Sequence, residues 1–224
     1  MSGAPHLNFD PSVLLLFPVF LVSIVVHECA HALVAWWHGD PTARERGRLT
    51  LNPLPHVHPI GSILVPGMLL AFRAPLLFGW AKPVPVDWAR LRRPRDDQLK
   101  VALAGPASNF LLALMFAGVI RLAPEAGFWA PLKIMGVAGV YWNCALGLFN
   151  LIPIPPLDGS WLLMRYLPLR HIIVLQQFRL VGMGIVVLLL SLPMFSDALV
   201  HRPLRMAVTA CLDLFGISTR GIVL

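Results

Sequence analysis

The most constraining feature of this chain is a pair of histidines inside a long apolar run. The run extends over residues 13–37 and contains His-Glu-Cys-Ala-His at positions 27–31. About 20 apolar residues in a helix span the hydrocarbon core of a bilayer, so this run is long enough to cross a membrane. An ionisable side chain in the middle of such a helix costs about 2.5–3.5 kcal/mol on insertion scales. The ionisable side chains of this run therefore need a compensating partner at membrane depth.

A divalent metal ion is the partner that the spacing favours. Residues four positions apart share one helix face, so His27 and His31 can bind the same Zn²⁺ at about 2.0–2.1 Å. Glu28 lies one position round the helix and is left to act as general base toward a water molecule, as in the HExxH arrangement of metalloproteases. The alternative is a chance match with both histidines satisfied by helix packing. The membrane setting disfavours it, because ionisable groups there are usually functional.

The composition is that of a multi-pass membrane protein. Of the 224 residues, 57% are hydrophobic and 13% are charged, and the apolar residues fall into several long runs. The formal net charge of +7 could indicate a nucleic-acid partner, but the basic residues lie in loops beside the apolar runs, where membrane topology explains them. We therefore expect a lipid bilayer and no nucleic acid as partner. The three cysteines have no C-x-x-C spacing and are predicted to be packing residues.

Basic loops predict the orientation of the first apolar run. The loop that follows it carries Arg44, Arg46 and Arg48, and such loops stay on the cytoplasmic side. The first helix is therefore expected to run inward, with its histidines nearer the cytoplasmic end. The first ten residues hold no basic segment, so a cleaved signal peptide is not expected.

The stretch at 60–80 is apolar but interrupted by proline and glycine at 66–67, and a second basic loop follows it at 90–100. Because the loops on both sides are basic, we predict a re-entrant hairpin here rather than a full crossing. The proline-rich segment just before it is predicted to be extended or a short strand near Leu49 and Leu51. Such a strand is a candidate edge for pairing with an unwound substrate segment.

Further apolar runs complete the expected fold. Residues 99–122, 134–152 and 172–192 are predicted to cross the membrane, and residues 198–215 are left open between a crossing, an interfacial helix and a partner-binding segment. The predicted fold class is an all-α polytopic membrane protein. It is a bundle of about five to six transmembrane helices with a re-entrant hairpin or a short strand segment after the first helix.

Asp158 is the predicted third ligand. Catalytic zinc sites commonly add a carboxylate to two histidines and keep one position open. Asp158 follows a segment broken by prolines at 153, 155 and 156, and irregular backbone at membrane depth is tolerated where it lines a cavity. If 60–80 is a hairpin, Asp158 arrives at the same cytoplasmic level as His27 and His31. The alternative is an Asp-Gly turn at the water surface.

Two further residues have open roles. Asn109 lies inside an apolar run after Gly105-Pro106, where its amide can bridge helices or donate a hydrogen bond to a substrate carbonyl. His56 and His58 are either additional ligands or ordinary loop histidines, and spacing does not decide between these readings.

In chain order these motifs resemble the site-2 protease family of intramembrane zinc metalloproteases, over about residues 20 to 165. The motifs are HExxH at 27–31, GRLTLNP at 47–53 with His56, GWAKPV at 79–84, GPxxN at 105–109, and Asn150 with LDG at 157–159. The resemblance implies one Zn²⁺ per chain held by His27, His31 and Asp158. It also implies Glu28 as base, with Asn109 and His56 helping to shape the site.

The resemblance further implies that the substrate is a transmembrane helix cut within or near the membrane. His58 departs from the pattern, because many relatives carry aspartate there, so a role for that carboxylate is not carried over. No stretch resembles a PDZ or CBS domain. We expect a compact, single membrane-embedded protease domain over 1–224, with a catalytic core at about 11–165 and C-terminal helices at about 172–218.

The expected function is that of a zinc metalloendopeptidase of the site-2 protease type. We expect it in a prokaryotic cell membrane, with the active site nearer the cytoplasmic side. The alternative is a membrane metal-binding or metal-transport protein without proteolytic activity, which leaves Glu28 without a task. The substrate's identity, a need for prior cleavage and the oligomeric state stay open.

Overall fold

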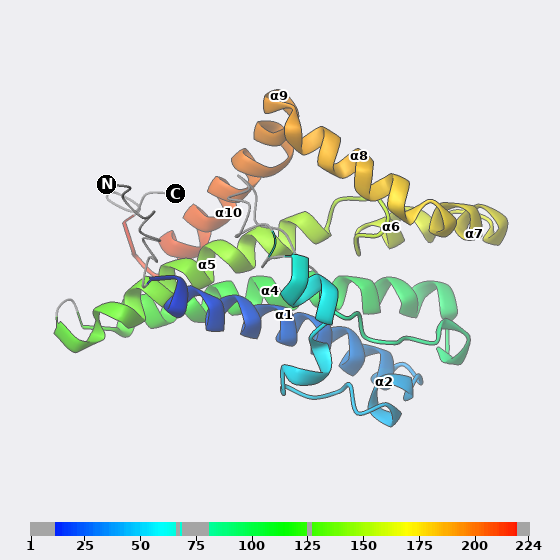
Figure 1. Ribbon diagram of the computed structural model, residues 1–224, viewed down its shortest axis with the longest axis horizontal. Helices are drawn as coiled ribbons and strands as arrows, with labels where there is room; N and C mark the ends of the chain where they lie inside the picture. The colour runs from blue at the N-terminus through cyan, green and yellow to red at the C-terminus, as the bar shows by residue number, and fades with distance from the viewer. Residues whose placement is uncertain (1–11, 66–67, 69–80, 125–126, 219–224) are drawn as a thin grey trace, which may run out of the picture.

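The computed structural model describes residues 12–65, 68, 81–124 and 127–218, and within them the regular structure is helical, without a strand. The predicted all-α class is therefore confirmed. Three long helices lie side by side at its centre: α1 (Ser12–Trp37), α4 (Pro94–Leu122) and α5 (Ala130–Asn150) (Figure 1). Each is long and apolar enough to cross a membrane.

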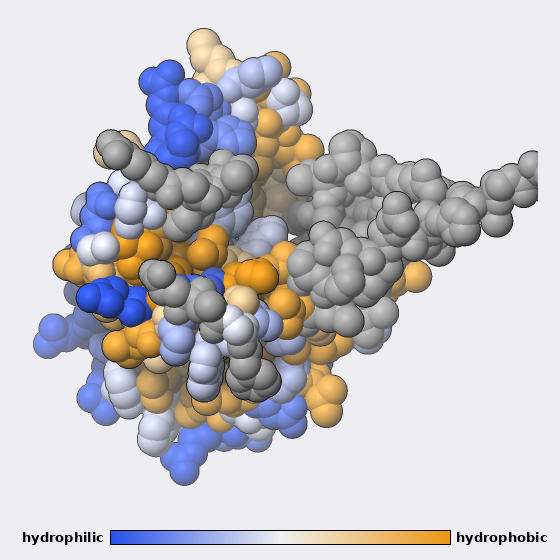
Figure 2. All heavy atoms as spheres, turned by 90° about the vertical axis from the view of Figure 1, so that its left-hand side faces the viewer, coloured by the Kyte–Doolittle hydropathy of each residue, from blue (hydrophilic) through white to orange (hydrophobic). Residues whose placement is uncertain are grey.

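The surfaces of these helices are apolar where a soluble protein would be polar. Phe17 of α1 and Met115 of α4 expose 61% and 67% of their surface, and Leu188 in the C-terminal part exposes 61%. Figure 2 shows one face of the molecule, on which hydrophilic residues lie mostly at the rim and apolar residues between them. Exposure on this scale suits helices whose outer surface contacts lipid.

Short helices connect α1 to α4. They are α2 (Thr42–Glu45), η1 (Leu54–His56), η2 (Pro59–Leu64) and η3 (Trp88–Arg90). Buried Asp40 ties the two ends of this connection together, because its carboxylate accepts hydrogen bonds from the backbone N–H of Thr42 (2.9 Å) and of Asp87 (2.7 Å). The end of α1 and the segment that leads into α4 are thereby held at one end of the molecule.

The predicted strand near Leu49 and Leu51 is wrong. The backbone there is bent, and the carbonyl oxygen of Thr50 accepts from Cys29 Sγ at 2.8 Å and contacts His56 Nε2 at 3.0 Å. Side chains from α1 and from η1 therefore take the acceptor that a strand ladder would use. The predicted re-entrant hairpin at 60–80 lies largely outside the described residues.

The C-terminal part differs from the predicted straight crossing at 172–192. A short helix, η4 (Gly127–Trp129), leads into α5. After α5 the chain forms α6 (Ser160–Met164), α7 (Leu169–Gln177), α8 (Arg179–Ser191), α9 (Pro193–Ser196), η5 (Asp197–His201) and α10 (Arg202–Asp213). The predicted crossing at 172–192 is two helices, α7 and α8, bent by 66°. The described residues thus hold three candidate spans, or four if the bent pair is one crossing, and a count of five to six is not confirmed.

The final helix, α10, continues the helical backbone of α9 and η5 without a break, and it is not among the candidate spans of the described residues. One face carries Leu204, Val208 and Leu212, which are buried in a cluster with Ala113 of α4 and Val140 of α5. This packing against the chain's own helices was not among the three readings left open for this segment.

Candidate metal centre and active site

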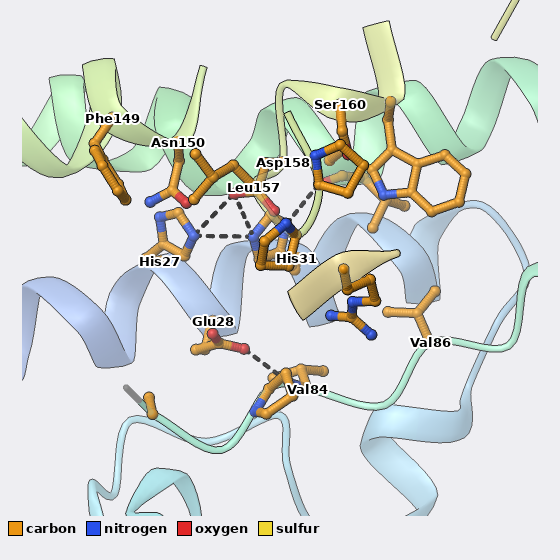
Figure 3. A pocket seen from close by; sticks show the side chains of 18 of the residues that line it. His27, Glu28, His31, Val84, Val86, Phe149, Asn150, Leu157, Asp158 and Ser160 are labelled. Carbon is orange, nitrogen blue, oxygen red and sulfur yellow. Dashed lines mark hydrogen bonds and ion pairs between the residues drawn. The ribbon is translucent and has the colours of Figure 1, made fainter. Parts of the chain in front are cut away.

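Three potential metal ligands meet beside the middle of the bundle. His27 and His31 project from one face of α1, and Asp158 approaches from the loop after α5 (Figure 3). The two Nε2 atoms lie 3.0 Å apart, and Asp158 Oδ2 lies 3.2 Å from His27 Nε2 and 3.3 Å from His31 Nε2. Both histidines are 9% exposed. The HExxH spacing and the proline-broken loop therefore converge on one point.

The Nδ1 atom of each imidazole, which faces away from the other ring, already makes a hydrogen bond. His27 Nδ1 donates to Asn109 Oδ1 at 2.6 Å, and His31 Nδ1 donates to the carbonyl oxygen of Val101 at 2.7 Å. Since a neutral imidazole carries one proton, each ring then presents a bare Nε2 to the other ring and to Asp158. Metal-ligating histidines are held in this way, with the second nitrogen bonded to an oxygen behind the ring.

The donor set fits zinc. At bond lengths of about 2.0–2.1 Å, two ligand atoms of a tetrahedral zinc lie about 3.3 Å apart, which agrees with the observed 3.0–3.3 Å. Asp158 Oδ2 is buried and has no hydrogen-bond donor among the described residues. Three electron-rich atoms at this separation repel one another unless a cation lies between them, and two histidines with a carboxylate are a known catalytic zinc set.

A buried polar network holds the oxygen behind His27. Asn109 is fully buried, and its Nδ2 donates to Asn143 Oδ1 at 2.9 Å and to the backbone oxygen of Ser23 at 3.4 Å. Asn143 Nδ2 donates in turn to Ser23 Oγ at 2.8 Å and to the carbonyl oxygen of Gly139 at 2.9 Å. One network thus joins α1, α4 and α5. Both amide hydrogens of Asn109 point into it, so this orientation offers its oxygen to His27 and no donor to a substrate carbonyl.

Gly105 lets α4 pass directly beside the two imidazoles. A Cβ atom at this position would overlap His31 Nε2 and lie 2.6 Å from His27 Nε2. The sequence motif contains this glycine, but sequence reasoning gave it no role, and it missed Ser23 and Asn143 entirely. The signal that could have found those two is a small polar side chain inside an otherwise apolar span.

Glu28 lies on the opposite side of the two histidines from Asn150 and Phe149 (Figure 3). Its Oε2 accepts a hydrogen bond from the backbone N–H of Val84 at 2.7 Å, and it lines the same cavity of about 630 Å³ as the three ligands. Val84 stands between Pro83 and Pro85, which have no N–H, so it supplies the single backbone donor of this tripeptide. The second carboxylate oxygen, Oε1, is left for other chemistry.

Comparison with known proteins supports the family resemblance. The profile named "Peptidase family M50" matches residues 118–193, which include Asp158. "Putative zinc metalloprotease YwhC" of Bacillus subtilis is 43% identical over 147 residues, covering 62% of this chain and 63% of the relative. "Putative zinc metalloprotease Rip2" of Mycolicibacterium smegmatis is 36% identical over 156 residues, covering 68% and 57%.

These matches support the resemblance to the site-2 protease family. The chain spans less than two thirds of the length of these two relatives. No solved structure matches it significantly. Together with this likeness, the apolar helices indicate an integral membrane protein.

His56 and His58 lie away from the three candidate ligands. Buried His56 contacts the Thr50 carbonyl oxygen, and its own carbonyl accepts from the backbone N–H of Lys82 at 2.9 Å. His58 Nδ1 accepts from the backbone N–H of Gly61 at 3.0 Å at the start of η2. Neither is among the described residues that line the cavity. His56 thus braces the segment that carries Val84, and it reaches Glu28 only through that segment.

Proposed function

We propose that this chain is a member of the site-2 protease family and a zinc metalloprotease that hydrolyses a peptide bond within or near a transmembrane helix of a membrane protein. The observation that carries the proposal is the triangle of His27, His31 and Asp158, with both histidine Nδ1 atoms engaged from behind. The names of the relatives and the three long apolar helices support it.

The roles of the chain's own residues follow from their positions. His27, His31 and Asp158 would hold one Zn²⁺, which supplies Lewis-acid activation of a water molecule and of the scissile carbonyl when bound. Glu28 takes the proton of the attacking water and returns it to the leaving amine. The N–H of Val84 fixes one oxygen of Glu28, so the other oxygen faces the reaction. Asn109 and the Val101 carbonyl orient the imidazoles.

We place the site nearer the cytoplasmic side. Both histidines lie in the second half of α1, and the loop that follows α1 carries an excess of arginine, as cytoplasmic loops do. A substrate helix would have to unwind locally before its backbone could enter the cavity, because helical peptide groups are already hydrogen-bonded to one another.

Zinc content and cleavage together test this function. In detergent-purified protein we expect about one zinc per chain by elemental analysis, lost in His27→Ala and Asp158→Ala. Glu28→Gln should keep the zinc and lose cleavage of transmembrane peptides. His171→Ala, an exposed histidine on α7, is the matched control and should keep both.

Two results would contradict the proposal. Zinc that is absent, or that is indifferent to Asp158→Ala, would break the ligand set. Zinc that binds as expected in a protein that cuts no transmembrane peptide, with Glu28→Gln indistinguishable from wild type, would favour metal binding or transport instead.

A further inference from the structure

The cavity beside the ligands contains one side chain whose positive charge the metal chemistry does not use. Most of the described lining is apolar, with Phe20, Phe149 and Met183 among the larger side chains. Besides the three ligands, the ionisable side chains among the described lining residues are Glu28 and Arg179. Asp158 and Glu28 would together balance the two charges of a bound zinc ion. The charge of Arg179 is then left over.

Close packing sets the position of Arg179. The residue begins α8 at the 66° bend from α7. One turn later, buried Gly182 rests on the loop that carries Asp158, and a Cβ there would overlap the carbonyl oxygen of Pro155. The contact presses α8 against the loop. The backbone of α8 therefore holds Arg179 on the wall of the cavity that Asp158 also lines.

A polar face on the bent pair accompanies this arginine. Gln176 and Met183 also line the cavity, and they lie three positions before and four positions after Arg179. Met183 lies one turn after Arg179 on the same side of α8, whereas Gln176 belongs to α7, just before the bend. The wall that α7 and α8 contribute to the cavity consists of an amide, a guanidinium and a thioether.

Within the described part of the chain, the Arg179 guanidinium has no acceptor. Other arginines do pair: Arg90 with Glu45 at 3.0 Å, and Arg165 with Asp96 at 2.8 Å. An unpaired arginine at the start of an apolar helix is costly, and reaching toward the membrane surface is the ordinary way to lower that cost. Here the exposed side chain also lines the cavity. Its planar fork of donors matches a carboxylate.

We propose that Arg179, with Gln176 beside it, recognises a carboxylate of the polypeptide substrate, either on an acidic side chain or at a chain terminus. This inference rests on the proposed proteolytic function and adds a substrate class to it: a mainly apolar segment that carries one negative charge close to the scissile bond. The apolar walls of the cavity cannot fix how far a segment has entered it. An ion pair with Arg179 would fix that position and so select the bond that is cut.

Peptide binding to the Glu28→Gln protein tests the proposal without any cleavage. The probes are fluorescent Leu/Ala peptides of about 20 residues in detergent micelles. Each peptide of the main set carries a single Glu, Gln or Lys, which is moved along the sequence from one peptide to the next, and each has an amidated C-terminus. One further peptide has no charged side chain and keeps a free C-terminal carboxylate. We expect the best carboxylate peptide to bind about 10-fold to 100-fold tighter than its Gln counterpart, and the Lys peptide to bind weakest. The winning probe tells an internal carboxylate from a terminal one.

Substitutions at Arg179 should remove or invert this preference. Arg179→Gln should bring the Glu and Gln peptides within about 2-fold of each other, and Arg179→Glu should favour Lys. Arg170→Gln removes the same charge from exposed α7 outside the described cavity lining and should leave the preference intact. Zinc content reports folding in every variant, and Arg179→Lys, which keeps the charge, should retain part of the preference.

Two outcomes would overturn the proposal: no carboxylate preference at any position in the Arg179-containing protein, or a preference that survives Arg179→Gln. The proteolytic function is tested separately: it fails if zinc-loaded protein with Glu28 intact cleaves no transmembrane peptide. Binding preferences in the Glu28→Gln protein do not depend on that result.

Discussion

The polar side chains on the two sides of the cavity differ in whether they have partners within the described residues. On the side of α1, α4 and α5, the polar side chains behind the ligands are buried and paired with one another, from Ser23 through Asn143 and Asn109 to His27. On the side of α7 and α8, Gln176 and Arg179 are exposed and have no partner within the described residues. The first side is complete without a substrate, whereas the second has polar groups that are free to bind one. Metal binding and substrate recognition are therefore separable by mutation.

The largest effect on the metal side is expected from Gly105→Ala. The added methyl group would overlap His31 Nε2, so the imidazoles must move out of the ligand triangle. Zinc affinity should fall at least about 100-fold in a chelator competition titration. Gly118→Ala on the same helix is the control, because its Cβ would meet Phe215 at an ordinary 3.5 Å. Equal affinities in the two variants would show that α4 does not press on the imidazoles as described.

Asn109→Ala should weaken zinc binding by about 10-fold to 100-fold, because His27 loses the oxygen that orients it. The visible spectrum of the cobalt-substituted protein should change as well, since the ligand field depends on ring orientation. Ser191→Ala, an exposed hydroxyl on α8, should alter neither affinity nor spectrum. An unchanged cobalt spectrum in Asn109→Ala would reduce this residue to a helix-packing role.

A smaller change is expected from Asn143→Ala, because Asn143 acts on His27 only through Asn109. Zinc affinity should fall about 3-fold to 10-fold, less than in Asn109→Ala. The double variant should be close to Asn109→Ala alone, since both substitutions interrupt one chain of hydrogen bonds. Additive losses of zinc affinity in the double variant would mean that the two asparagines act independently.

The smallest effect on the metal is expected from Met183→Ala, on the opposite wall. Met183 lines the cavity from α8 without taking part in the ligand network, so zinc affinity should stay within about 2-fold of wild type while apolar peptides bind about 3-fold to 10-fold more weakly. Chelator titration measures the zinc affinity, and fluorescence anisotropy of labelled peptides on the same preparation measures peptide binding. A large fall of zinc affinity in Met183→Ala would contradict the separation of metal binding from peptide binding.

Sequence reasoning reached the metal ligands because local spacing and membrane topology both report on them. The i, i+4 spacing put His27 and His31 on one face of a helix, and the charge bias of the loops put Asp158 at the same level. Neither argument applies to Ser23 and Asn143, whose pairing depends on how three helices are rotated against one another. The pattern of apolar residues within one segment does not report how that helix is rotated against its neighbours.

The errors elsewhere have a similar origin. The alternation around Leu49 favoured a strand, but side chains from Cys29 and His56 take the carbonyl of Thr50, and both contacts come from outside the segment. The predicted straight crossing at 172–192 overlooked the bend between Gln177 and Arg179. The polar residues there were visible in the sequence, but the contact of Gly182 with the Pro155 carbonyl belongs to tertiary packing.

The two hydrogen bonds behind the imidazoles also set the sliding position of one membrane helix against another. His27 and His31 lie one turn apart on α1, and their acceptors lie on antiparallel α4, so a shift of a single residue, about 1.5 Å, would break both bonds together. A metal ion held by both rings and by Asp158 would fix the ring orientation that these two bonds require. A bilayer too thick or too thin for the bundle would then weaken metal binding, because a shift of α1 against α4 strains the same two bonds.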